Sequence, residues 1–139
     1  MKSISTKYIL SLTSLLLLSA HPASAADIDV NQALSMNQQG ALLLDVREVE
    51  EYNEIHAPNA MLIPLGQLSS RIQEISAYKN KPIAVMCRSG RRSEKAVHLL
   101  QEAGFLRVDN VTGGMLAWQK SGLKTDSSQY VQLMKRPPL

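Results

Sequence analysis

Three short apolar runs, none of which alternates with polar residues, constrain the fold of this 139-residue chain more than any other feature. They occupy residues 41–44, 60–63 and 83–86, and segments with helical spacing follow them. A strand that is apolar on both sides needs cover on both sides, as in a parallel sheet with crossover helices. The chain is therefore expected to form a three-layer α/β fold, with a central, mostly parallel sheet of about five strands flanked by helices.

Helix signals accompany these strands. Asp29 and Ser93 are expected to be N-caps of two helices, because short polar side chains there can bond free backbone N–H groups. Val49 and Leu99 are expected on the buried faces of their helices. Helical spacing is present at 31–39, 48–55, 65–75 and 93–103, and a fourth strand is expected at 108–111 before a short helix that carries Leu116 and Trp118.

The first 25 residues have the layout of a secretory signal peptide. A positively charged start precedes a 13-residue apolar segment at 8–20, which is shorter than the roughly 20 residues that span a bilayer. Ala23 and Ala25 are the small residues of a cleavage site, so we expect cleavage between Ala25 and Ala26. The product would be periplasmic or secreted, without a stable membrane anchor. The expected division is a signal peptide at 1–25, a domain at 26–125 and a C-terminal tail at 126–139.

The charge balance argues against a nucleic-acid partner. The whole chain has a formal charge of +3, but Lys2 and Lys7 would leave with the signal peptide. The remaining 13 basic and 12 acidic residues nearly cancel. Nucleic-acid binding needs a clustered surplus of basic residues, so we expect no such partner.

Cys87 is the only cysteine of the chain. It cannot form an internal disulfide, and with only His56 and His98 beside it in the mature chain it makes no recognisable zinc site. We therefore expect no metal or other cofactor. A lone cysteine in an exported protein is either buried and inert or a reactive thiol. Cys87 follows the apolar run at 83–86, and the carboxyl ends of strands are where open α/β sheets bind ligands.

The residues after Cys87 favour the reactive reading. Gly90 permits a left-handed turn that aims backbone N–H groups inward, and the following helix adds its positive end. An ordinary thiol with a pKa near 8.5 is about 3% ionised at pH 7, and lowering that pKa by about two units makes roughly three-quarters of it thiolate. The candidate loop consists of Cys87, Arg88, Ser89, Gly90, Arg91 and Arg92.

This loop resembles the active-site loop of the rhodanese family of sulfurtransferases, and the resemblance extends over residues 27–123. One departure is Asn59, where glycine is usual; asparagine tolerates the left-handed backbone better than most residues. Three further motifs carry the resemblance: Leu43-Leu44-Asp45-Val46-Arg47-Glu48 with Glu51-Tyr52, His56-Ala57-Pro58-Asn59-Ala60, and Gly113-Gly114-Met115-Leu116-Ala117-Trp118.

The resemblance implies a rhodanese-like fold and sulfur transfer through a persulfide on Cys87. A small anionic donor such as thiosulfate would supply the sulfur, and cyanide or a thiol, including a protein thiol, would accept it. Arg88 and Arg91 are candidates for attracting the donor, while Arg92 either joins them or braces the loop. Ser89 and Gly90 would contribute loop amides.

Two alternatives remain open at this point. The domain could be a persulfide carrier that relays sulfur between proteins without turning over small donors. A related class of cysteine phosphatases has its arginine six residues after the cysteine, where this chain has Ser93. Asp45, Arg47 and His56 are supporting candidates: a structural ion pair or a loop hydrogen bond is expected for Asp45 and Arg47 rather than acid–base catalysis, and turn bracing for His56 rather than proton donation.

Overall fold

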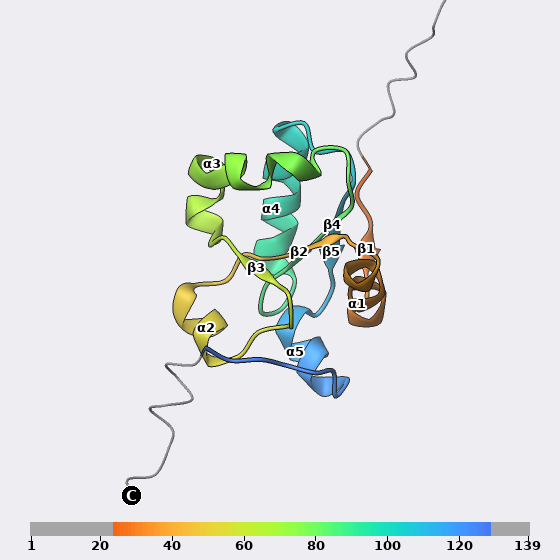
Figure 1. Ribbon diagram of the computed structural model, residues 1–139, viewed down its shortest axis with the longest axis vertical. Helices are drawn as coiled ribbons and strands as arrows, with labels where there is room; N and C mark the ends of the chain where they lie inside the picture. Colours follow the sequence, from red (N-terminus) through yellow and green to blue (C-terminus); the bar gives the residue numbers. More distant parts are fainter. Residues whose placement is uncertain (1–23, 129–139) are drawn as a thin grey trace, which may run out of the picture.

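The computed structural model describes residues 24–128. Its centre is a five-stranded parallel sheet with the strand order β1-β5-β4-β2-β3 (Figure 1). This sheet confirms the expected α/β class. The strands are β1 (Asp27–Ile28), β2 (Leu42–Asp45), β3 (Met61–Leu62), β4 (Ile83–Met86) and β5 (Val108–Val111).

Helices cover both faces of the sheet and complete three layers (Figure 1). On one face lie α3, α4 and two 3₁₀ segments, and on the other lie α1, α2 and α5. The helices are α1 (Val30–Gln38), α2 (Val49–Glu54), α3 (Leu68–Arg71), α4 (Arg91–Glu102) and α5 (Gly114–Lys120), and the 3₁₀ segments are η1 (Leu65–Gln67) and η2 (Ile72–Tyr78).

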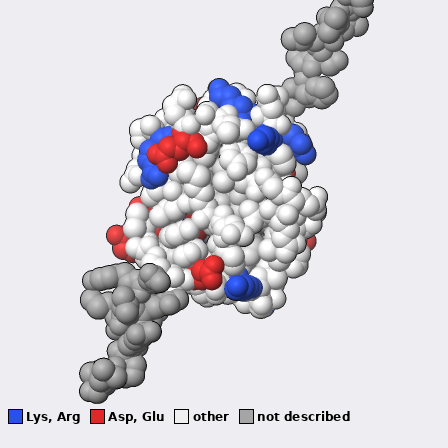
Figure 2. Space-filling view, in the orientation of Figure 1, with Lys and Arg blue, Asp and Glu red and all other residues white. Residues whose placement is uncertain are grey.

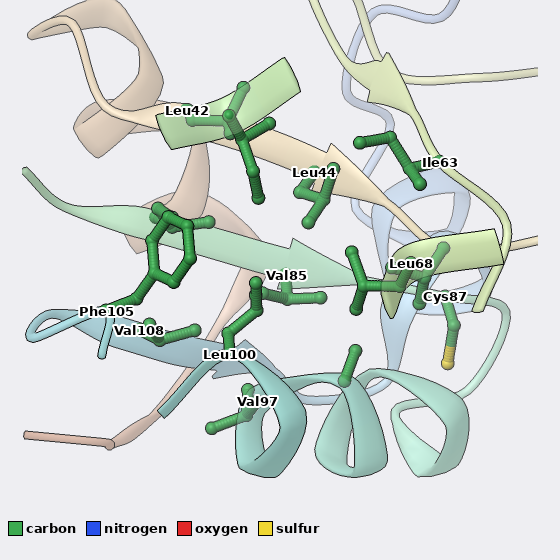
Figure 3. Close-up of a cluster of buried hydrophobic side chains, with 14 residues drawn as sticks. Leu42, Leu44, Ile63, Leu68, Val85, Cys87, Val97, Leu100, Phe105 and Val108 are labelled. Atoms are coloured by element: carbon green, nitrogen blue, oxygen red, sulfur yellow. The ribbon is translucent and has the colours of Figure 1, made fainter. Parts of the chain in front are cut away.

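Successive residues of the central strands enter opposite cores. Leu44 and Val85 face the cluster beneath α3 and α4, while Leu43 and Ala84 face the cluster beneath α1 and α5. All four side chains are fully buried, which explains why their strands show no polar alternation. Figure 3 shows the first cluster, with Cys87 at the end of the cluster next to the first turn of α4.

The structure corrects the expected start of α4. The helix begins at Arg91, and Gly90 is its N-cap with a φ of 104°. Ser93 was expected to be the cap, but it lies within the first turn and is fully buried. Glycine adopts a left-handed φ at little cost, so the loop can turn directly into the helix two residues earlier.

Two residues expected on buried faces are exposed. Val49 is 42% exposed at the first position of α2, and Leu99 is 36% exposed on α4. The buried stripe of α4 runs through Ala96, Val97 and Leu100, and Leu99 lies outside it because successive helical residues are about 100° apart.

The segment 65–78 contains one turn of α-helix between two 3₁₀ segments, not one α-helix. Its apolar residues recur mainly three positions apart, as in Leu65 and Leu68 or Ile72 and Ile75. Three residues form one turn of a 3₁₀ helix, so this spacing suits the observed form. The sequence pattern had indicated helix without separating the two types.

The chain ends of the described region are attached to the domain. Ser24 bridges to Arg107 beside β5, and Asp126 pairs with the backbone of His56. Ser128 donates its backbone N–H to the carbonyl oxygen of Asn53 in α2. The expected signal peptide falls almost entirely on residues 1–23, and most of the expected tail on 129–139, which lie outside the described residues.

No helix within residues 24–128 is long and apolar enough to cross a membrane. The face drawn in Figure 2 has lysines and arginines that stand apart around the periphery, with acidic groups between them. This face therefore presents no broad basic surface.

Candidate active site

Cys87 lies where the topology of the sheet opens a crevice. It follows β4, whose neighbours are β2 and β5. The chain leaves β2 through α2 to reach β3 on one side, and it leaves β4 through α4 to reach β5 on the other. Adjacent parallel strands whose connections diverge in this way define the usual ligand position of an open α/β sheet.

The Cys87 sulfur is surrounded by hydrogen-bond donors. Its side chain is only 1% exposed. The backbone N–H of Gly90 donates to Sγ at 3.1 Å, and the Ser93 hydroxyl oxygen lies 3.4 Å from Sγ. Burial raises the pKa of the Cys87 thiol, but the bonds from the Ser93 side chain and from the backbone of Ser93, Gly90 and Ser89 outweigh it and hold that pKa below its ordinary value. The site therefore favours a thiolate.

The backbone at and after the glycine pair 113–114 packs against the start of the loop. The carbonyl oxygen of Cys87 accepts from the backbone N–H of Met115 at 2.8 Å, and that of Arg88 accepts from Leu116 at 3.1 Å. A Cβ on Gly114 would overlap the Cys87 carbonyl oxygen. Glycine is required here by close backbone approach as well as by its φ of 51°. The sequence pattern had indicated only a turn at this position.

The three loop arginines have different surroundings. Arg92 forms a two-pronged ion pair with Glu51, at 2.7 and 2.8 Å, which ties the loop to α2. Arg88 and Arg91 are exposed. These three arginines line a hollow of about 530 Å³ together with Ser89, Glu94 and Lys95. An anion that enters the hollow would meet Arg88 and Arg91 as its most accessible arginines.

Glu51 braces the loop through Arg92, a role that the sequence analysis did not assign to it. Its hydrogen bond from Arg92 lowers the pKa of Glu51 to about 2, although burial opposes this. The same bond raises the pKa of Arg92. Both groups therefore stay charged at neutral pH. No local sequence pattern could have found this pair, because 41 residues separate its two members.

Asp45 and Arg47 form the expected ion pair, at 2.7 Å, and both are buried. The guanidinium of Arg47 also donates to the carbonyl oxygens of Glu51 and Ile55. The pair thereby joins the end of β2 to α2. Arg47 lines a second hollow, of about 260 Å³, next to Arg88.

His56 is held at the turn that follows α2. Its ring stacks on Tyr52 with a centroid distance of 3.9 Å, and its Nδ1 lies 2.7 Å from the Tyr52 carbonyl oxygen. These contacts fit the expected bracing of a turn. Asn59, a few residues on, has a φ of 61°, so it does adopt the left-handed backbone expected of it.

Within residues 24–128, no group of three or more His, Cys, Asp or Glu side chains is placed to hold a metal ion. The groups that the structure does place together at this site are the Cys87 sulfur, its hydrogen-bond donors and the adjacent arginines. The site thus consists of a buried, hydrogen-bonded cysteine that follows the central strand β4 of a three-layer α/β domain and begins the loop that leads into α4.

Comparison with known proteins gives the family. A family model described as a rhodanese-like domain matches residues 29–121. A rhodanese-like domain from Anabaena sp. shares this fold with a TM-score of 0.67 and 30% identity, over 81% of this chain and 84% of that one. A rhodanese-related protein from Thermoplasma volcanium gives a TM-score of 0.64 and 31% identity, over 73% and 97%. The chain belongs to the rhodanese family.

Curated relatives include sulfurtransferases. One from Allochromatium vinosum is 35% identical over 85 residues, which are 61% of this chain and 78% of that protein. Thiosulfate sulfurtransferase 18 of Arabidopsis thaliana is 36% identical over 103 residues, with 66% and 76% covered. A putative sulfur carrier protein of Bacillus subtilis is 45% identical over 76 residues, but the chain spans only 40% of its length.

Proposed function

We propose that this protein is a sulfurtransferase that carries a sulfane sulfur as a persulfide on Cys87. The observation that carries the proposal is the sulfur itself, which is buried at a switch point of the sheet, with the Gly90 N–H donating to it at 3.1 Å and the Ser93 hydroxyl oxygen 3.4 Å away. Both groups can donate to a thiolate, and neither is a strong general base. Persulfide chemistry needs a nucleophilic sulfur rather than a base.

In the proposed first step, the Cys87 thiolate attacks the outer sulfur of an anionic donor such as thiosulfate. A sulfur–sulfur bond forms at Cys87 while the bond inside the donor breaks, and sulfite leaves with that electron pair. In the second step, cyanide or a thiolate attacks the outer sulfur of the persulfide. Cys87 leaves as a thiolate, so the cycle needs no external oxidant or reductant and is expected to follow ping-pong kinetics.

The exposed arginines are proposed to attract the donor. Arg88 and Arg91 face the 530 Å³ hollow, whereas Arg92 is engaged with Glu51. Of the two sequence interpretations of Arg92, this ion pair supports loop bracing. A thiol on another protein is a further candidate acceptor.

Mass spectrometry of the intact protein after exposure to thiosulfate tests the proposal. We expect a mass gain of one sulfur atom on Cys87, followed by its loss when cyanide is added. Cys87→Ser is the control, since a serine oxygen cannot hold a transferable sulfur. A Cys87→Ser protein that retains the adduct, or a folded wild type that never gains it from any sulfane donor, would refute the persulfide.

A persulfide carrier is the second candidate. The resemblance to a putative sulfur carrier protein favours it. Steady-state turnover separates the two roles: an enzyme cycles with small donors and acceptors, whereas a carrier loads once and releases sulfur only to a protein partner. A phosphatase is disfavoured, because the buried Ser93 occupies the position where that class has its arginine.

We also propose that the chain is exported and cleaved between Ala25 and Ala26, leaving a periplasmic or secreted protein. The proposal rests on the layout of residues 1–25; cleavage there would remove the bridge between Ser24 and Arg107 and free the Ala26 nitrogen, which donates to the Asp109 carboxylate at 3.0 Å. A new α-ammonium group at Ala26 would keep this partner as an ion pair. N-terminal sequencing of the exported protein should begin at Ala26, and recovery of the uncleaved chain in membranes would contradict the proposal.

A further inference from the structure

The Ser93 hydroxyl lies between two acceptors. Its oxygen is 2.7 Å from Oδ1 of Asn110 and 3.4 Å from Sγ of Cys87. A hydroxyl has one proton, so it can donate to only one of them at a time. While Cys87 is a neutral thiol, its sulfur is a weak acceptor, so that proton lies on the bond to the amide oxygen of Asn110.

Asn110 is itself held in one orientation. Its Nδ2 donates to Oδ1 of Asp27 at 3.0 Å, across the paired strands β5 and β1. Because a carboxylate only accepts hydrogen bonds, the amide nitrogen must face Asp27 and the amide oxygen must face Ser93. Asp27 thereby fixes which end of Asn110 the serine meets.

The series of hydrogen bonds that links Cys87, Ser93, Asn110 and Asp27 depends on the protonation and sulfur loading of Cys87. With a neutral thiol, the Cys87 S–H can donate to Ser93 while the Ser93 O–H donates to Asn110. With a thiolate, the Ser93 O–H must turn to Sγ, and Oδ1 of Asn110 loses its donor. In a persulfide the negative charge lies on the outer sulfur, so the Ser93 O–H can return to Asn110.

We propose that Asn110, oriented by Asp27, is a positioning residue that competes with Cys87 for the Ser93 proton and so restrains thiolate formation in the sulfur-free state. The consequence rests on the proposed persulfide: Asn110 favours the loaded protein over the free thiolate, because only the thiolate deprives it of a bond. Asn110 acts through Ser93 and does not contact the sulfur donor.

The charged groups near this series of hydrogen bonds must stay the same in any test. On α4, Glu94 and His98 share a hollow of about 170 Å³ with Asp27 and Asn110. Further charges on the adjoining elements include Arg88, Arg91 and Arg92 at the loop, Lys95 on α4 and Asp109 on β5. The decisive variants therefore change no charge.

The first variant is Asn110→Leu, which removes the acceptor at similar size. The readout is the pH dependence of Cys87 alkylation in the sulfur-free protein, which has no other cysteine to react. We expect the midpoint to fall by about 0.5–1 pH unit, since one competing hydrogen bond is lost. Thr112→Val is the matched control: Thr112 directly follows β5, and the change removes its side-chain hydrogen bond to the Ile28 carbonyl oxygen without touching Ser93, so the midpoint should not move.

The second test separates a positioning role from a general disturbance. Ser93→Ala should raise the midpoint, because the thiolate loses a donor. The double variant Ser93→Ala with Asn110→Leu should match Ser93→Ala alone, since Asn110 acts only through the serine. Should Asn110→Leu fail to fold, Asn110→Ala replaces it with the same expected sign.

An unchanged or raised midpoint in Asn110→Leu would overturn the proposal, and so would a fall that persists without the Ser93 hydroxyl. The alkylation assay uses no sulfur donor. A shifted midpoint without any sulfur uptake would therefore reject the proposed function alone, and normal sulfur uptake with an unshifted midpoint would reject this inference alone.

Discussion

The carboxyl ends of β2 and β4 lie side by side in the sheet, where Asp45 is paired in register with Met86, yet they are built in opposite ways. At the end of β2, Asp45 is fully buried and Arg47 is 3% exposed. Their charges meet each other, and the guanidinium also satisfies two carbonyl oxygens of the α2 segment. At the end of β4, the sulfur of Cys87 is buried, but Arg88 and Arg91 are exposed.

The difference indicates that the β2 end serves the stability of the fold and the β4 end serves the chemistry of the site. The β2 end is closed, because every charge within it has a protein partner. The β4 end keeps hydrogen-bond donors at the buried sulfur and two exposed arginines at the surface. The Glu51–Arg92 ion pair joins the two ends by tying α2, which follows β2, to the loop that follows β4.

Removing the Asp45–Arg47 ion pair at the β2 end should have the largest effect of all on the free energy of unfolding. Asp45→Ala leaves the Arg47 guanidinium buried without its carboxylate, which typically costs about 3–5 kcal/mol. We expect a large loss in the free energy of unfolding, measured by urea denaturation. Glu74→Ala is the control, since it removes an exposed ion pair with Arg71 and should change the unfolding midpoint little. Equal, small effects of the two substitutions would show that the closed end is not a structural anchor.

Removing the exposed arginines at the β4 end should lower the activity and leave the stability of the fold unchanged. The double variant Arg88→Ala with Arg91→Ala removes two exposed cations from the hollow, each worth on the order of 0.5–1.5 kcal/mol for an anionic donor. We expect kcat/KM for thiosulfate to fall about fivefold to a hundredfold, mainly through KM. The free energy of unfolding should stay near that of the wild type.

Salt provides the matched measurement for this prediction. Added salt screens exposed charges, so it should weaken the wild type more than the double variant. Lys120→Ala, at the last position of α5 and outside the lining of the hollow, should keep the salt dependence of the wild type. Parallel salt dependence in the wild type and the double variant would mean that the arginines do not attract the donor.

How far the sequence predicts each end depends on the range of its contacts. The Asp45–Arg47 pair spans two positions, and the strand before it has a clear apolar run, so both were expected. The position of Cys87 and the left-handed Gly90 were also readable locally. By contrast, the Glu51–Arg92 and Asn110–Asp27 contacts span 41 and 83 positions.

Such contacts follow from the strand order, which the sequence pattern does not give. β1 has only two residues and no apolar run, so this strand was not expected. Ser93 was misread for a related reason. Its hydroxyl suits an N-cap, but only the packed structure reveals that it is buried between Cys87 and Asn110.

The smallest expected effect concerns the link between the two ends. Glu51→Gln removes the charge that Arg92 meets, while its amide oxygen can still accept from the backbone N–H of Glu48. Because both partners are about one-third exposed, solvent screens the pair, and its loss should cost only about 0.5–1 kcal/mol at neutral pH.

The pH dependence of this loss has a definite sign. The bond from Arg92 holds the pKa of Glu51 in the folded state at about 2, below its ordinary value of 4.5. The unfolded state thus binds the proton more readily, so the stabilisation is complete above pH 4.5 and is lost as the pH falls toward 2. The gap in the free energy of unfolding between the wild type and Glu51→Gln should therefore narrow between pH 5 and pH 3 in urea titrations. A gap that stays constant across this range would show that the substitution acts through packing or the helix start, and that the charge of Glu51 does not hold the loop to α2.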